Sequence, residues 1–253
     1  MTVAVSGIQS RLRGALSIVG REALRIVLPS WCAACDSELP WRERTSSCCA
    51  SCWASLPKIT MPKCRSCAQP ASIADLEAFT CFNCVADPLP VDWCDAWGEY
   101  KGALERLLRA LKFKRHDFLA DALSSLLEGT LRERADLAFD AIVAVPMPRA
   151  RERRRGYNQA ELLADALSRR LGIRCDRTLL TRKGERATQS TLPKRQRAAN
   201  VRGAFTASTV VEGTSVLLVD DISTTGETIR ACAAALTEAG ASRVCAIAVA
   251  KAS

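Results

Sequence analysis

Eight cysteines in the first third of this chain form four pairs with the spacing Cys-x-x-Cys, and this pattern constrains the fold of the region more than any other feature. A two-residue spacer lets one tight turn present two thiolates, and a tetrahedral zinc site needs four of them at about 2.3 Å. Twelve or more residues separate the two pairs of each half, which is the layout of a zinc ribbon. The first quartet is Cys32, Cys35, Cys49 and Cys52, and the second is Cys64, Cys67, Cys81 and Cys84.

The two quartets predict two structural zinc ions, each with four protein ligands and therefore without an open position for catalysis. Disulfide bonds are one alternative for such pairs, and iron in the same thiolate cage is another. A cytoplasmic location argues against disulfides, because thiols stay reduced there. Cys48 adjoins Cys49 and could replace it as a ligand, so the choice between these two stays open.

The amino-terminal residues favour a cytoplasmic protein. Arg11, Arg13, Arg21 and Arg25 interrupt the apolar residues of this stretch, so it lacks the continuous apolar core of a secretory signal. No apolar run in the chain approaches the roughly 20 residues that cross a bilayer. We expect residues 1–28 to form an amphipathic helix that packs on the rest of the fold; a helix on a membrane surface and a segment that imitates a transit peptide are the alternatives.

Beyond the cysteine pairs, helical and strand-like patterns alternate. The segment VADPLPVD carries two prolines, and we place a domain boundary there, near residue 90. Residues 29–90 then form a double zinc-ribbon region, and residues 91–253 form an α/β domain. Strands that are apolar on both faces and separated by helices indicate a mainly parallel sheet covered by helices. The expected strands span residues 140–148, 216–221 and 243–251, and the expected helices span residues 100–113, 118–129, 158–172 and 225–240.

The stretch VLLVDDISTTGETI, residues 216–229, predicts a ligand site at the carboxyl end of a strand, where sites in such sheets lie. Free backbone N–H groups and the helix dipole at the following turn favour a phosphate. Gly226 lets the backbone approach the ligand, and the neighbouring threonine hydroxyls can donate to phosphate oxygens. Asp220 and Asp221 suit the two hydroxyls of a ribose instead, because carboxylates accept hydrogen bonds. The predicted ligand is a ribose 5-phosphate.

The formal charge of +9 is unevenly distributed along the chain. Between Lys112 and Arg197 there are 20 Lys and Arg residues and 11 Asp and Glu residues, an excess of nine that equals the excess of the whole chain. A polyphosphate and a nucleic acid would both suit such a segment, and so would a plain solvated basic surface.

Residues 216–229 resemble the signature with which type I phosphoribosyltransferases bind phosphoribosyl pyrophosphate (PRPP), an apolar run followed by Asp-Asp, a spacer and Thr-Thr-Gly-x-Thr. The resemblance implies that Asp220 and Asp221 hold the ribose hydroxyls. It implies a mainly parallel sheet of the type I phosphoribosyltransferase kind, preceded by a small Cys-rich zinc-ribbon region. The residues that it assigns to the 5-phosphate are Thr224, Thr225, Gly226, Glu227 and Thr228.

The order of motifs from Cys32 to Lys251 resembles the ComF family of competence-associated proteins, which implies a link to the uptake of transforming DNA. Four Cys-x-x-Cys pairs precede LKFKRHD, VAVPMPRARERRRGYNQAELLA, TQSTLPKRQRAANVRGAF and the PRPP signature. The resemblance implies phosphate or pyrophosphate contacts in the first two motifs and a ligand-covering loop in the third. An exposed basic turn and a plain surface loop are the alternatives. The implied ligand residues are Lys112, Arg149, Arg155, Gly156, Asn158, Gln159, Gln189, Arg197 and Asn200.

These features favour a glycosyltransferase that binds PRPP, transfers its 5-phosphoribosyl group to an acceptor and releases pyrophosphate. Catalysis would depend on Asp220, Asp221 and Arg155, with Mg²⁺ held mostly by substrate oxygens and water. The alternative is a non-catalytic zinc-ribbon protein that senses PRPP, or that binds single-stranded DNA or the DNA-uptake machinery. The basic segment contains few aromatic residues on which bases could stack, which favours the enzyme.

Overall fold

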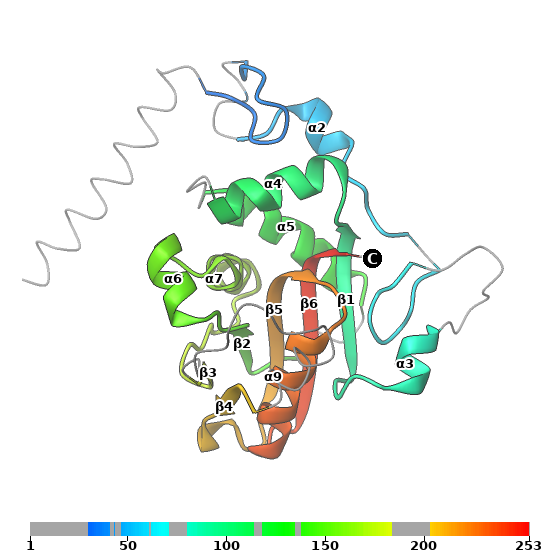
Figure 1. The fold of residues 1–253 in the computed structure, drawn as a ribbon, viewed down its shortest axis with the longest axis vertical. Helices are drawn as coiled ribbons and strands as arrows, with labels where there is room; N and C mark the ends of the chain where they lie inside the picture. Colours follow the sequence, from blue (N-terminus) through cyan, green and yellow to red (C-terminus); the bar gives the residue numbers. More distant parts are fainter. Residues whose placement is uncertain are drawn as a thin grey trace, which may run out of the picture. The chain divides into compact units, whose positions relative to one another are not determined.

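The computed structural model describes residues 30–40, 43, 47–60, 62–70, 80–113, 118–134, 138–183 and 203–252 (Figure 1). The helix predicted over residues 1–28 lies outside these ranges, as do Gln189, Arg197 and Asn200. The chain divides into two compact units, residues 1–56 and residues 57–253. This division falls between the two cysteine quartets, whereas the boundary predicted from the prolines follows both. Within the described ranges, no helix has the length and apolarity needed to span a membrane.

The two quartets are built on the same kind of turn. Asp36 follows the first pair with a left-handed φ of 57°, and Ala68 follows the third pair with a φ of 59°. Each of these residues donates its N–H to the carbonyl of the first cysteine of its pair at 2.9 Å. The other two pairs each lie at the start of a five-residue helix, α2 (Ala50–Ala54) in the first unit and α3 (Phe82–Ala86) in the second.

A four-stranded sheet forms the core of the larger unit. All three pairs of neighbouring strands are parallel. Every residue of β2 and all but the first of β6 are buried, because helices cover the sheet on both faces. The predicted α/β fold with a mainly parallel sheet is therefore confirmed. The strand order is β1 (Trp93–Glu99), β6 (Arg243–Lys251), β5 (Ser215–Ser223) and β2 (Ala141–Ala144).

Helices α5 (Leu119–Arg132) and α7 (Gln159–Leu171) pack side by side on one face of this sheet, and α9 covers the other face (Figure 1). The antiparallel β3–β4 hairpin, formed by β3 (Leu180–Arg182) and β4 (Phe205–Ala207), packs against α9. The remaining elements are α4 (Gly102–Phe113), α6 (Arg149–Arg155), the 3-10 helix η2 (Thr209–Val211) and α9 (Glu227–Glu238).

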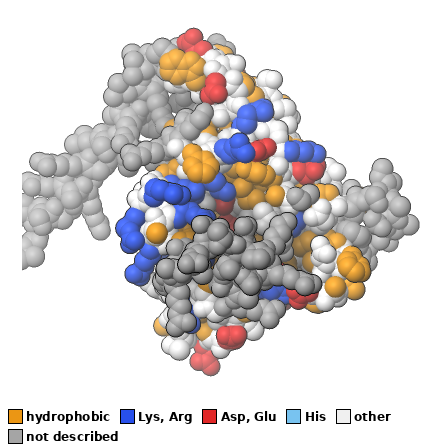
Figure 2. All heavy atoms as spheres, viewed as in Figure 1, with side chains coloured by type: hydrophobic (Ala, Val, Ile, Leu, Met, Phe, Trp, Pro, Cys, Tyr) orange, Lys and Arg blue, Asp and Glu red, His pale blue; other side chains and the backbone are white. Residues whose placement is uncertain are grey.

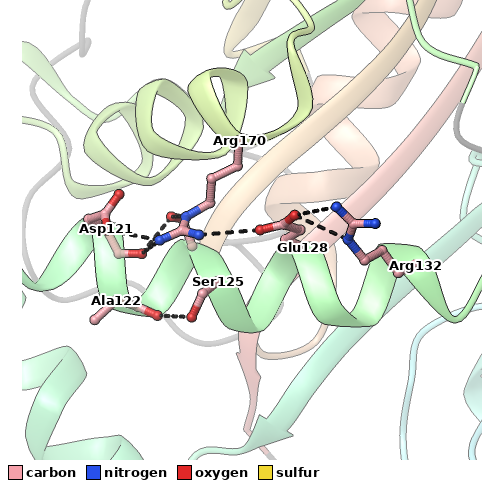
Figure 3. A network of polar contacts seen from close by, with 7 residues as sticks. Asp121, Ala122, Ser125, Glu128, Arg132 and Arg170 are labelled. Atoms are coloured by element: carbon pink, nitrogen blue, oxygen red, sulfur yellow. Dashed lines mark hydrogen bonds and ion pairs between the residues drawn. The ribbon is translucent and has the colours of Figure 1, made fainter.

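A polar network joins α5 to α7 (Figure 3). Arg170 of α7 donates to Ser124 Oγ and to Asp121 Oδ2, both at 2.9 Å, and its Nη1 lies 3.3 Å from Glu128 Oε2. Glu128 also accepts a hydrogen bond from Arg132 of its own helix at 2.8 Å, which is the main cause of its lowered pKa. The network fixes the helix whose first turn faces the candidate site described below.

The carboxyl ends of β5 and β6 lie side by side, with Ser223 paired in register with Lys251. β5 continues through Ser223, and α9 begins at Glu227. The strand thus ends two residues after the predicted end at residue 221, the helix begins two residues after the predicted start at residue 225, and residues 224–226 connect them.

Gly98→Ala is expected to destabilise the protein by about 1 to 3 kcal/mol. A Cβ at this position of β1 would lie 2.7 Å from both Leu104 Cδ2 and the Pro57 carbonyl oxygen. Gly129→Ala is the matched control, because a Cβ at this exposed position of α5 meets nothing within 4 Å. Alanine should stabilise the helix there by about 0.5 to 1 kcal/mol. Urea unfolding followed by circular dichroism measures both changes, and an unchanged stability of Gly98→Ala would contradict the close packing at β1.

Candidate functional site

Asp220 and Asp221 point to opposite faces of the sheet, because successive side chains of a strand alternate. Asp221 is only 4% exposed. Its Oδ1 accepts a hydrogen bond from Gln159 Nε2 at 3.2 Å, and its Oδ2 forms an ion pair with Lys112 Nζ. Asp220 lies on the α9 side, where its charge acts on the buried thiol of Cys232. The two carboxylates therefore have different surroundings.

Burial raises the pKa of Asp220 well above its ordinary value, and the neighbouring Asp221 carboxylate raises it further. A hydrogen bond from the Asp221 N–H to Asp220 Oδ1, at 2.8 Å, opposes this rise. A carboxylate in such surroundings is stabilised by any hydroxyl or cation that reaches it. This end of β5 therefore suits a ligand that carries hydroxyl groups.

Three helix ends converge on Asp221. Lys112 lies in the last turn of α4, Arg155 is the last residue of α6, and Gln159 is the first residue of α7. Arg155 Nη1 donates to Gln159 Oε1, so the amide of Gln159 links the guanidinium to the carboxylate. Next to these groups is a cavity of about 200 Å³ that three cations border, as an anionic ligand would require. Its lining residues are Lys112, Phe113, Arg154, Arg155 and Tyr157.

Gly156 and Asn158 produce this convergence by reversing the chain between α6 and α7. Gly156 ends α6 with a φ of 90°, which favours glycine, and its N–H donates to the Glu152 carbonyl at 2.6 Å. Asn158 caps α7, since its Oδ1 accepts from the Ala160 N–H at 3.1 Å while its Nδ2 donates to the Val145 carbonyl at 3.0 Å. Both residues are implied ligands by resemblance, and the structure shows them shaping the backbone beneath the site.

Exposed arginines cover α6, and Figure 2 shows Lys and Arg side chains gathered over this part of the surface. Arg155 differs from the others because it is half-buried and lies 5.2 Å from the ring centroid of Phe113, a residue that is itself 72% exposed. Helix α6 therefore turns one arginine toward the site and presents the rest to solvent. The exposed ones are Arg149, Arg151, Arg153 and Arg154.

The turn after β5 has the features of a phosphate site. Thr224 and Thr225 are exposed, so their hydroxyls can reach a ligand. Gly226 has a φ of 83° and lies at the N-cap of α9, where it offers no side chain to the first N–H groups of the helix. Helix α9 has 12 residues, and it directs these groups and the positive end of its dipole to the turn. Glu227 and Thr228, both half-buried, form its first turn.

The sequence motifs do not include two cations that hold this turn in place. Lys251, buried at the end of β6, donates from Nζ to the Thr224 carbonyl. Arg230 of α9 donates to the carbonyls of Asp87 at 2.8 Å and Pro88 at 2.6 Å. A lysine at the end of an otherwise apolar strand is a signal that could have marked Lys251. No local pattern marks Arg230.

Each cysteine quartet has a geometry that fits a tetrahedral metal ion. All four Sγ atoms of a quartet lie within 4.8 Å of one another. The Sγ atoms of Cys35 and Cys49 are 3.9 Å apart, and those of Cys67 and Cys81 are 3.6 Å apart. Sulfur atoms at about 2.3 Å from a tetrahedral zinc ion stand ~3.8 Å apart, so both quartets suit structural zinc.

Cys49, and not Cys48, completes the first quartet. Cys49 is the N-cap of α2, and its Sγ accepts the N–H of Cys52 at 3.4 Å. Cys48 is buried with its Sγ 4.0 Å from that of Cys32, and burial together with the charge of Cys32 raises the pKa of its thiol. Cys48 therefore packs against the first quartet as a buried thiol and is not one of its four ligands.

Backbone N–H groups point at the first thiol of each quartet. The N–H of Cys49 donates to Cys32 Sγ, and the N–H of Cys81 donates to Cys64 Sγ, both at 3.3 Å. Burial opposes ionisation of Cys64, but the N–H of Cys81 and two N–H groups of its own turn outweigh it and lower the pKa to about 7. The ligand that a metal needs, a thiolate, is thus favoured at this position.

Known families match both regions of the chain. A family described as "Double zinc ribbon domain" matches residues 23–96, and a family described as "Phosphoribosyl transferase domain" matches residues 157–253. The protein is thus a zinc-ribbon protein with a domain of the phosphoribosyltransferase type.

Curated relatives define the family further. DNA utilization protein YhgH of Escherichia coli K12 is 36% identical over 185 residues, which cover 72% of this chain and 80% of that protein. Competence protein F of Haemophilus influenzae is 33% identical over 156 residues, covering 59% and 68% of the two chains. Competence protein ComFC of Bacillus subtilis is 28% identical over 224 residues, covering 83% and 89%. The chain belongs to the ComF family, as its motif order predicts.

Among solved structures, the chain matches part of the glutamine PRPP amidotransferase from B. subtilis in complex with ADP and GMP. The match has a TM-score of 0.35 and 23% sequence identity, and it covers 51% of this chain and 25% of that one.

We expect the chain purified under reducing conditions to contain two zinc ions, because each quartet supplies four converging thiols. Cys49→Ala should lower the content to one ion, while Cys48→Ala should leave it at two. Plasma mass spectrometry of the desalted proteins measures both. Loss of an ion from Cys48→Ala with two retained by Cys49→Ala would overturn the assignment of the first quartet.

Proposed function

We propose that this protein binds PRPP at the carboxyl end of β5 and transfers its 5-phosphoribosyl group to an acceptor, releasing pyrophosphate. The observation that carries the proposal is the convergence of Lys112 and Arg155 beside Asp221, three residues before a turn suited to phosphate. One end of this arrangement suits a monophosphate and the other a pyrophosphate. The carboxylates between them suit a sugar with two free hydroxyls.

Each part of PRPP has a proposed partner. The N–H groups and threonine hydroxyls of residues 224–228 bind the 5-phosphate. Asp220 and Asp221 accept hydrogen bonds from the ribose hydroxyls. Lys112 and Arg155 bind the pyrophosphate in the cationic cavity, and the exposed Arg149 at the start of α6 is a further candidate for the same anion. Gln159 orients Arg155 toward the ligand.

The proposed reaction breaks the bond between the ribose C1 and a pyrophosphate oxygen, and the leaving group takes the bonding electron pair. A lone pair of the acceptor forms the new bond to C1. Positive charge develops on the ribose ring and negative charge on the pyrophosphate, so Lys112 and Arg155 stabilise the departing group. Mg²⁺, bound mostly by substrate oxygens and water, would supply further charge neutralisation when present.

Binding of single-stranded DNA is a second candidate function. Four exposed arginines on α6 are more than one pyrophosphate requires, and the exposed ring of Phe113 beside Arg155 offers a surface for a base. The names of the relatives, which refer to DNA utilization and competence, agree with this function. Both candidate functions fit a cytoplasmic protein, in which cysteines stay reduced, and among the described residues no cysteine forms a disulfide bond.

The double variant Asp220→Asn/Asp221→Asn is expected to weaken PRPP binding by about two to four decades. Each change exchanges an acceptor oxygen for a donor amide, and hydrogen bonds to charged groups contribute roughly 1.5 to 3 kcal/mol each. Titration calorimetry with PRPP and Mg²⁺ measures the loss. Asp140→Asn is the control, since this exposed acid lies at the opposite end of the sheet, where it accepts the N–H of Ser215. Equal affinity of the double variant and the wild type would refute the ribose assignment.

Arg155→Ala should weaken PRPP binding by at least tenfold and ribose 5-phosphate binding much less, because only PRPP carries the pyrophosphate. Arg153→Ala on the same helix is the control and should leave both affinities unchanged, since its side chain faces solvent. The same variants are titrated with a labelled oligonucleotide. If both lose DNA affinity while both keep PRPP affinity, the surface of α6 serves nucleic acid rather than pyrophosphate.

A further inference from the structure

The second cysteine quartet contacts the sheet in two places, through the residue before Cys64 and through the residue after Cys67. Ala68, next to Cys67, is fully buried in a cluster with Ile59 and with Ala96 of β1 and Ala248 of β6. On the chain just before the quartet, Lys63 Nζ lies 2.6 Å from Asp95 Oδ1, a carboxylate buried on β1.

The residues that follow the last cysteine of the quartet are hydrogen-bonded to α9, the helix that follows the phosphate turn. Helix α3 contains Cys84 and ends at Ala86 with Asp87 as its C-cap, and the carbonyls of Asp87 and Pro88 both accept hydrogen bonds from Arg230. Arg230 Nη2 also lies 3.1 Å from Asp87 Oδ2. Arg230 belongs to the first turn of α9, and its N–H donates to the Gly226 carbonyl at 2.8 Å. Arg230 thus connects the two segments: its guanidinium binds the carbonyls after α3, and its backbone N–H binds Gly226 of the turn.

Two further contacts reach the turn itself. Leu89 is buried, and a Cβ at Gly226 would lie 3.1 Å from Leu89 Cδ2, so this side chain covers the backbone of the turn. Lys251, buried at the end of β6, donates from Nζ to the Thr224 carbonyl and so holds the turn from the neighbouring strand.

We propose that the second cysteine quartet is a structural part of the phosphate-binding turn, so that a metal ion held by this quartet and a phosphoribosyl ligand at the turn stabilise each other. This inference rests on the proposed function for the identity of the ligand. A five-residue helix is unstable alone, and metal ligation at Cys81 and Cys84 fixes α3 at its start and middle. Without the ion, the carbonyls that Arg230 holds lose their support. Coupling of this kind is reciprocal, so the ligand must also retain the metal.

Arg230 is a positioning residue in this scheme, and hydrogen exchange of the turn tests it in the full zinc-loaded chain. Arg230→Ala should raise the exchange rate of a peptide covering residues 224–230 about tenfold or more, because two hydrogen bonds from a charged group are lost. Arg230→Lys keeps a cationic donor and should restore part of the protection. Arg174→Ala, which removes a surface ion pair with Asp176, should exchange like the wild type. Wild-type exchange of the turn in Arg230→Ala overturns the proposal.

Cysteine alkylation tests the reciprocal effect. The full chain is treated with N-ethylmaleimide and a chelator, with and without PRPP and Mg²⁺, and each cysteine is followed by peptide mass spectrometry. PRPP should slow labelling of the second quartet several-fold in the wild type and much less in Arg230→Ala, while the first quartet reacts at one rate throughout. Equal protection of both quartets, or of neither, while calorimetry shows PRPP bound overturns the coupling.

The two experiments separate this inference from the proposed function. If calorimetry shows no PRPP binding at millimolar concentration, the proposed function fails, and ligand coupling fails with it. The exchange experiment then still decides whether the second cysteine quartet supports the turn, because it needs no ligand.

Discussion

The candidate site depends on the compensation of one buried carboxylate, that of Asp221 at the end of a central strand. A carboxylate removed from water is costly unless a cation and hydrogen-bond donors replace its hydration. Lys112, in the last turn of α4, supplies the cation, and Gln159, the first residue of α7, supplies a hydrogen-bond donor. Arg155 joins them because its guanidinium donates to the Gln159 amide oxygen. The cations are thus in place before a ligand arrives, which is how preorganised sites stabilise developing charge.

The sequence predicts much of this fold because the signals involved are local. Apolar runs give β5 and β6, helical periodicity gives α7, and Gly172 ends α7 with a φ of 70° as its position implies. Contacts between distant segments leave no such trace. The β3–β4 hairpin pairs Leu180 with Ala207, and neither strand has a pattern long enough to identify.

The site shows the same division between local and distant information. The residues of the turn are contiguous, so a single motif includes them, but the pairing of Lys112 with Asp221 has no spacing that a sequence could reveal. The alternation of side chains along a strand does predict that Asp220 and Asp221 point to opposite faces of the sheet. Interpreting the two carboxylates as one pair overlooks that rule.

The cysteine quartets are the opposite case, since Cys-x-x-Cys spacing encodes their geometry directly. The different surroundings of the two quartets depend on tertiary packing around Ala68, which the sequence does not reveal.

The position of β6 within the sheet has a consequence for the order of folding during synthesis. β6 is the last strand in the sequence, yet it lies between β1 and β5 and pairs with both. Until Arg243–Lys251 has left the ribosome, β1 has no partner in the sheet, and the edges of β1 and β5 that pair with β6 stay open. Parallel pairing between such distant segments is slow, because long loops must close before any contact forms. The cysteine quartets need only short stretches of chain, so they can bind metal well before the sheet closes.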